Sequence, residues 1–178
     1  MEQEEQQLKA AIAYLPPDEQ EEVCDALEKV RHWHAGQKRE SGEPFVVHLI
    51  RTAMYLARLE CGSNTLIAGL LHDVVEDGAA SLDTIRKEFD EDIAKLVDAV
   101  TKLTKLRYEG RRSERQIQSL RKMLLAASED LRVIFIKLAD NLCGAFFTID
   151  CSEISQLRRR YHNTPGMFTG ISRDTLKL

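Results

Sequence analysis

Apolar residues recur at intervals of three and four along most of the chain, a spacing that places them on one face of an α-helix. The segment 91–104 shows this clearly, with Ile93, Leu96, Val97, Val100 and Leu103. The only β-branched cluster of note, Arg132–Ile136, continues into Lys137–Asp140 and fits a buried helix better than a strand. The sequence therefore predicts an all-α fold.

Helix-breaking and capping residues divide this pattern into separate helices. Pro16-Pro17 ends the first helix, Asp18 is the expected N-cap of the second, and the polar segment 36–44 is a loop. Asn64 and Ser81 are expected to cap two later helices. The predicted helices cover residues 4–14, 18–35, 46–60, 65–76, 81–89, 91–104, 116–127 and 130–143.

Length and charge limit the classes of function. A chain of 178 residues suits one domain with a buried core, and a net charge of −4 gives no reason to expect binding to nucleic acid or a membrane. No apolar run approaches the roughly 20 residues of a membrane-spanning helix, and the acidic N-terminus does not resemble a signal peptide. The four cysteines have neither the spacing of a zinc ribbon nor that of a disulfide framework. We therefore expect a cytoplasmic protein; the sequence carries no signal of oligomeric state.

The helix predicted over 65–76 carries an unusual group of ionisable residues near its end. With about 100° between successive residues, His72, Asp73, Glu76 and Asp77 share one arc of the helix. Three acids on the rim of an apolar helix repel one another, and a bound cation is the usual remedy. This arrangement points to a metal site.

A histidine and an aspartate supply only two ligands, whereas an octahedral divalent transition metal requires further nitrogen and oxygen donors. His48 at the start of one apolar helix, and Asp140 late in another, can supply them. Spacing alone favours a simpler alternative to the metal site, in which the acidic helix end is solvated and the histidine is packed.

Four separated motifs favour the metal site over this alternative. They are Arg39-x-Ser41-Gly42-Glu43-Pro44-Phe45-x-x-His48, Leu70-Leu71-His72-Asp73-x-x-Glu76-Asp77, Val100-Thr101-Lys102-Leu103 and Ile136-Lys137-Leu138-Ala139-Asp140. In this order they resemble the hydrolase domain of the RelA/SpoT homologues, the enzymes of guanosine tetraphosphate and pentaphosphate turnover. The resemblance covers about residues 18–142.

The resemblance implies a metal-dependent phosphohydrolase with an HD-domain helical bundle. It implies that Glu76 and Asp77 handle the hydrolytic water and its proton. The implied reaction removes the 3′-pyrophosphate of ppGpp or pppGpp to give GDP or GTP and pyrophosphate, so the implied partner is a guanine nucleotide. The implied ligands of Mn²⁺, or of another divalent transition metal, are His48, His72, Asp73 and Asp140.

The loop before the third predicted helix is expected to bind the substrate. Arg39 resembles the family's basic residue next to the nucleotide, where a guanidinium can stack on the base or meet phosphate. Lys38 and Ser41 are assigned to the same role, although the pattern alone would favour a solvated loop. His34 lies beside Trp33 and is expected to pack at its edge rather than act in catalysis.

The resemblance breaks after Asp140. The family typically continues Asp-Arg-Leu-His-Asn-Met-Arg-Thr, whereas Gly144 and Phe147 here replace the asparagine and the threonine that would contact the nucleotide. We expect an N-terminal helical extension, an HD hydrolase domain and a divergent C-terminal tail, with no room for a synthetase domain. Their expected bounds are 1–17, 18–150 and 151–178.

Two alternatives to alarmone hydrolysis stay open. An altered pocket could make the chain an HD phosphohydrolase of another nucleotide or phosphoester. A catalytically weak nucleotide-binding or regulatory module is the second alternative, in which the ion and a basic exposed loop at 102–115 would hold the ligand without turnover.

Overall fold

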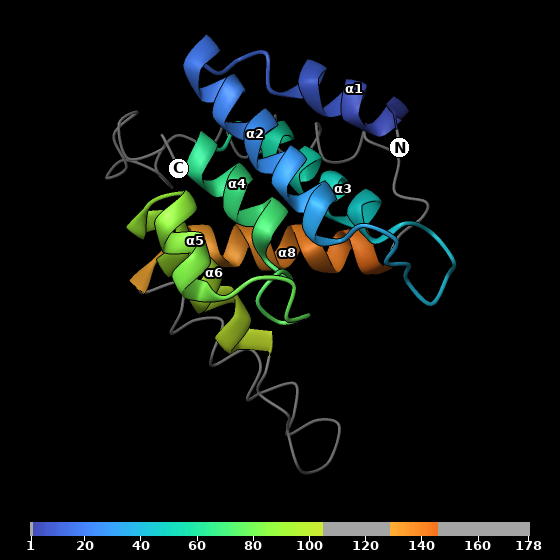
Figure 1. The fold of residues 1–178 in the computed structure, drawn as a ribbon. Coiled ribbons are helices and arrows are strands. Elements are labelled where there is room, and N and C mark those ends of the chain that lie inside the picture. The colour runs from blue at the N-terminus through green and yellow to red at the C-terminus, as the bar shows by residue number, and fades with distance from the viewer. Residues whose placement is uncertain (1, 105–128, 146–178) are drawn as a thin grey trace.

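The structure is a computed structural model that describes residues 2–104 and 129–145, and within these ranges every regular element is an α-helix (Figure 1). The all-α prediction is confirmed. The predicted helix 116–127, most of the loop 102–115 and the predicted tail lie outside the described residues. The helices are α1 (Glu2–Ala11), α2 (Pro17–Trp33), α3 (Phe45–Arg58), α4 (Ser63–Leu71), α5 (Leu82–Glu88), α6 (Glu91–Thr104) and α8 (Leu131–Ala145).

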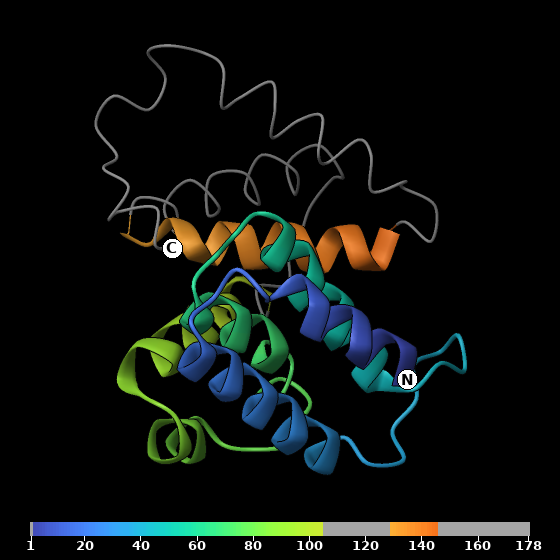
Figure 2. The ribbon, with the colours of Figure 1, turned by 90° about the horizontal axis from the view of Figure 1, so that it is seen from above.

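Helix α4 forms the centre of the bundle. It contacts α2, α3, α6 and α8, and all of its residues except Asn64 are buried, which explains its nearly continuous apolar sequence. Figure 2 shows α8 running along one side of the bundle, and it packs there against α3 and α4. None of the described helices has the length and apolar character needed to cross a membrane.

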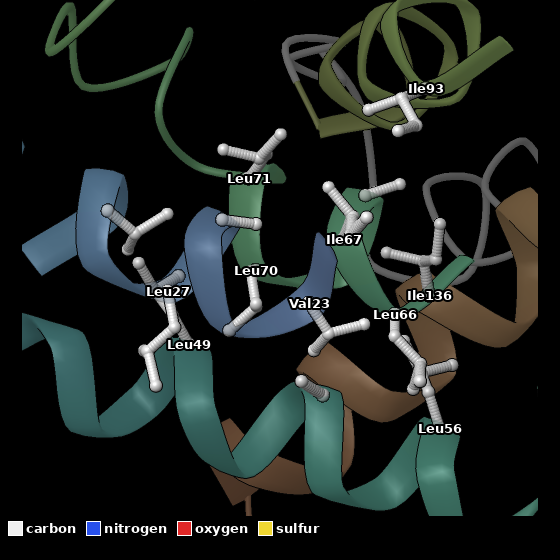
Figure 3. Close-up of a cluster of buried hydrophobic side chains, with 14 of the residues drawn as sticks. Val23, Leu27, Leu49, Leu56, Leu66, Ile67, Leu70, Leu71, Ile93 and Ile136 are labelled. Carbon is white, nitrogen blue, oxygen red and sulfur yellow. The ribbon is translucent and has the colours of Figure 1, made fainter. Parts of the chain in front are cut away.

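One hydrophobic core fixes these helices against one another (Figure 3). Each fully buried leucine or isoleucine contributes about 1.5–3 kcal/mol relative to an exposed one. The core therefore holds the start of α3, the end of α4 and the middle of α8 in a fixed relation. Its labelled members are Val23, Leu27, Leu49, Leu56, Leu66, Ile67, Leu70, Leu71, Ile93 and Ile136.

Helix α1 is also part of the packed structure, because it lies against α3. Leu8 of α1 and Ile12, which directly follows the helix, are each only 1% exposed. With α4 and α8 on its other sides, α3 is buried around most of its circumference. This burial accounts for the long apolar sequence that surrounds His48.

Helix α4 ends at Leu71, earlier than the predicted end at residue 76, and residues 72–78 form turns. The early end buries the Val74 side chain in the core, and Gly78 adopts a φ of +71°, in the left-handed region that favours glycine. The predicted single helical arc of His72, Asp73, Glu76 and Asp77 is therefore wrong, although the segment stays beside α4.

Of the three predicted helix caps, the structure confirms Ser81 and contradicts Asp18 and Asn64. Ser81 caps α5 as expected, because its Oγ accepts a hydrogen bond from the backbone N–H three residues later at 3.1 Å. Asp18 does not cap α2, which begins one residue earlier at Pro17, where the fixed φ of proline suits the first helical position. Asn64 does not cap α4 and instead donates to Asp92 Oδ2 at 2.9 Å.

Candidate metal centre

Two histidines and two aspartates converge where α3, α4 and α8 meet. His48 lies in the first turn of α3, His72 directly follows α4, and Asp140 comes from α8. His48 Nε2 is 3.3 Å from Asp140 Oδ1 and 3.7 Å from Asp73 Oδ2. His72 Nε2 is 3.2 Å from the same Asp73 oxygen and 3.5 Å from Asp140 Oδ1. The structure thus brings together all four residues that the sequence assigned to a metal.

The His72 imidazole is held in one orientation by the backbone of α4. Its Nδ1 lies 2.8 Å from the carbonyl oxygen of Gly69, and because a carbonyl only accepts, Nδ1 carries the proton. In the neutral ring, Nε2 therefore carries the lone pair, and it faces the carboxylates. This buried atom makes no hydrogen bond within the described residues, although two carboxylate oxygens lie at 3.2 and 3.5 Å. A cation would satisfy the nitrogen and both oxygens together.

The His48 imidazole also faces the two carboxylates through its Nε2. Its Nδ1 lies 3.2 Å from Cys143 Sγ, and the thiol donates to the His48 carbonyl at 3.6 Å. The sequence pattern did not predict a role for Cys143 in the site. The only local signal was its position three residues after Asp140, which places both side chains on one face of a helix.

Asp140 uses its two carboxylate oxygens for different partners. Oδ1 faces the histidines, while Oδ2 accepts a hydrogen bond from Lys137 Nζ at 2.6 Å. Lys137 belongs to the motif Ile136–Asp140 but was not predicted to support the site. The signal for such a role is its spacing of three residues from Asp140 on a helix. This contact fixes the direction in which Oδ1 points.

The electrostatics of the cluster favour a bound positive charge. Burial alone would lower the pKa of His72, but Asp140 and Asp73 raise it to about 10. Burial works to raise the pKa of Asp73 and of Asp140, yet their contacts with the histidines lower both. Without a metal, the cluster holds a proton on His72 at neutral pH, and a divalent cation would take that place.

Glu76 and Asp77 lie in the turn after α4, beside the ligand group, and both are exposed. The backbone N–H of Asp77 donates to the Asp73 carbonyl at 2.8 Å, which ties this turn to the site. Burial, and then the charge of Asp73, raise the pKa of the Asp77 carboxyl above its usual value. A carboxyl perturbed in this direction beside a metal site suits proton transfer.

The loop that precedes α3 forms a tight hairpin. The N–H of Arg39 donates to the Glu43 carbonyl at 2.9 Å, and the N–H of Gly42 donates back to the Arg39 carbonyl at 2.8 Å. Ser41 is exposed near the tip. Burial raises the pKa of the Cys143 thiol, and the positive charges of Arg51 and Arg39 act against this.

Lys38 lies next to a cavity. It lines a cavity of about 490 Å³ between the end of α2 and the loop, together with Arg31, His34 and Pro44. None of the four expected metal ligands lines this cavity. Arg39, which was predicted to share the role of Lys38, is not among the residues that line it.

His34 packs as expected, but against Phe45. The two rings stack with centroids 4.9 Å apart, and Nδ1 of His34 lies 2.6 Å from Gln37 Oε1. Phe45 and His48 form an edge contact with ring centroids 6.2 Å apart. His48 and His72 form another, with ring centroids 5.4 Å apart. The packing of His34 on Phe45, and of Phe45 on His48, therefore supports the His48 imidazole.

Comparison with known proteins agrees with this geometry. A family model described as an HD domain matches residues 26–171, so the chain belongs to the HD domain family. A guanosine-3′,5′-bis(diphosphate) 3′-pyrophosphohydrolase of Borreliella burgdorferi is 44% identical over 129 residues, which make up 72% of this chain and 19% of the relative. The bifunctional (p)ppGpp synthase/hydrolase SpoT of Escherichia coli strain K12 is 42% identical over 165 residues, 93% of this chain and 22% of the relative.

A solved structure is similar as well. It is described as a metazoan orthologue of SpoT that hydrolyses ppGpp and plays a role in starvation responses. It is 26% identical with a TM-score of 0.55, over 76% of this chain and 79% of that chain. The predicted resemblance is confirmed: this is an HD domain of the RelA/SpoT type. The chain spans about a fifth of the length of the curated relatives it matches.

Proposed function

We propose that the chain removes the 3′-pyrophosphate of ppGpp or pppGpp to give GDP or GTP and pyrophosphate. The observation that carries this proposal is the convergence of His48, His72, Asp73 and Asp140 around a buried imidazole nitrogen that has no hydrogen bond within residues 2–104 and 129–145. The names of the curated relatives and of the solved structure support the substrate class.

The donor set fits a divalent transition metal, and we assign Mn²⁺ to it. Two neutral imidazole nitrogens and two carboxylates suit Mn²⁺ and similar ions, whereas the absence of a thiolate among these ligands does not favour softer metals. Such a cation lowers the pKa of water and neutralises charge on the departing phosphoryl group. His48, His72, Asp73 and Asp140 would hold it.

The chain's own side chains supply the remaining steps. Glu76 and Asp77, exposed in the turn next to Asp73, accept the proton of the attacking water and return it to the leaving group. Arg39, in the loop that precedes α3, stacks on the base or meets phosphate. Lys38 and Ser41 contribute further contacts to the nucleotide from the same loop.

The test is incubation of the purified chain with Mn²⁺ and guanosine tetraphosphate, with GDP and pyrophosphate followed by chromatography. We expect metal-dependent product that is lost, together with metal retention, in Asp73→Ala. The matched control is Asp98→Ala, because Asp98 is an aspartate of α6 that forms an ion pair with the exposed Lys102. No product from the metal-loaded protein would overturn the proposal.

The same assay separates the alternatives. Product from another nucleotide, but not from guanosine tetraphosphate, would indicate a different HD phosphohydrolase. Saturable binding of guanosine tetraphosphate without product would indicate a regulatory module. The predicted cytoplasmic location and the domain bounds 1–17, 18–150 and 151–178 stay predictions.

A further inference from the structure

We propose that Cys143 is a positioning residue of the metal centre, which holds the His48 imidazole in the tautomer and orientation needed to bind a cation. This inference rests on the proposed function, because it assigns a support to one of the proposed ligands. It concerns a residue in the segment where the chain departs from the family pattern, so the support is a property of this chain's own sequence.

The hydrogen-bonding roles around Cys143 are mutually consistent. The thiol donates its hydrogen to the His48 carbonyl at 3.6 Å, which leaves the sulfur lone pairs free to accept. His48 Nδ1 lies 3.2 Å from that sulfur and can donate to it. A proton on Nδ1 leaves the lone pair on Nε2, the atom that faces Asp140 at 3.3 Å.

His72 provides the internal comparison. Its Nδ1 donates to the Gly69 carbonyl at 2.8 Å, so the two histidines use the same ring atom for support and the same ring atom for the metal. For His72 the acceptor is backbone and survives any side-chain change at position 69. For His48 the acceptor is the side chain of Cys143, so this support can be removed by one substitution.

The support also links two helices. Cys143 lies nearly one turn after Asp140 in α8, whereas His48 lies in α3. Helix α8 therefore contributes one proposed ligand directly and fixes a second through the thiol. Thr52 Oγ1 donates to the same His48 carbonyl at 3.1 Å, which anchors the backbone end of the residue.

The test is titration of Mn²⁺ into the metal-free protein by calorimetry, in reducing buffer, for wild type, Cys143→Ala, Cys143→Ser and Cys24→Ala. Cys24 is a free, half-buried cysteine in α2 and serves as the matched control. We expect Cys143→Ala to weaken Mn²⁺ affinity by roughly 10- to 100-fold, the scale of lost supporting contacts in metal sites. Serine keeps a donor and an acceptor, and should restore most of the affinity; Cys24→Ala should bind as wild type.

A merely structural role for the thiol predicts a different result. It would lower the melting temperature of metal-free Cys143→Ala without a selective loss of Mn²⁺ affinity, and serine would not restore binding. Wild-type affinity in Cys143→Ala would overturn this inference and leave the proposed function standing. Wild-type protein that binds no Mn²⁺ would instead overturn the proposed metal centre itself, and with it the role of Cys143.

Discussion

The carbonyl oxygen of Gly69 accepts a hydrogen bond from Nδ1 of His72 at 2.8 Å. The same glycine lets α4 approach α3 closely, because a Cβ atom at position 69 would lie 2.5 Å from Leu56 Cδ1. One residue therefore sets both the spacing of two core helices and the orientation of a proposed ligand.

Gly69→Ala is expected to destabilise the protein by about 1–3 kcal/mol, the usual cost of overpacking a core. Chemical denaturation measures this change. Combination with Leu56→Ala, which removes the clashing methyl groups, should give a double variant that is less destabilised than the sum of the two single changes. Additive losses would show that Leu56 and position 69 do not compete for space.

Glu76→Gln is expected to retain the metal and slow hydrolysis by roughly 10²-fold or more, the scale of a lost general acid or base. The reason is that Glu76 lies in the exposed turn beside the ligands and not among them. Metal content and the rate of GDP release measure the two effects separately. Glu91→Gln, at an exposed position in α6, is the control. A near-normal rate would remove Glu76 from the mechanism.

Affinity for Mn²⁺ is expected to rise with pH. The pKa of His72 is about 10 in the metal-free protein, against an ordinary value of 6.5, so at neutral pH a cation must displace a proton from this ring. Release of one proton corresponds to about tenfold tighter binding for each pH unit below that pKa. Calorimetry in buffers of different ionisation enthalpy counts the released proton; an affinity that does not change with pH would contradict this assignment.

The same pKa sets the direction of a stability change in the metal-free protein. Because the folded value of about 10 exceeds the ordinary 6.5, this group stabilises the folded state fully below pH 6.5. That contribution falls as the pH rises towards 10. Urea denaturation of metal-free protein across this range should show the loss, and saturating Mn²⁺ should suppress it.

Arg132→Met is expected to destabilise the protein by about 1 kcal/mol, near the upper end for a partly exposed ion pair. Its guanidinium contacts both carboxylate oxygens of Asp92, at 2.6 and 2.7 Å, and also pairs with Asp130. This bidentate contact ties the start of α8 to α6. Lys102→Met, which breaks an exposed pair within α6, should change stability by less; equal losses would show no special contribution from Arg132.

Features determined by nearby residues could be predicted from the sequence. The Ser81 cap and the bounds of α6 depend on a few adjacent side chains, and both were predicted correctly. The convergence of His48 with His72 and Asp140 could not come from spacing, because it requires three helices to pack; it followed from the order of the family motifs.

Features that depend on tertiary contacts were missed. The end of α4 at Leu71 is set by burial of Val74 against other helices, and no local residue pattern encodes that contact. The contact between Cys143 and His48 was not predicted, because His48 lies in another helix far away in the sequence. Lys137 was visible as a neighbour of Asp140 on the same helix face, but its contact needed the observed side-chain direction.

The early end of α4 has an electrostatic consequence. The aligned peptide groups of a helix place about half a negative elementary charge at its C-terminus, and the effect fades within one turn. Since α4 ends at Leu71, that charge lies beside His72 and Asp73, whereas a helix continuing to residue 76 would carry it past them. The backbone thus adds its own attraction for a cation, and variants that lack an acidic ligand will retain that part of it.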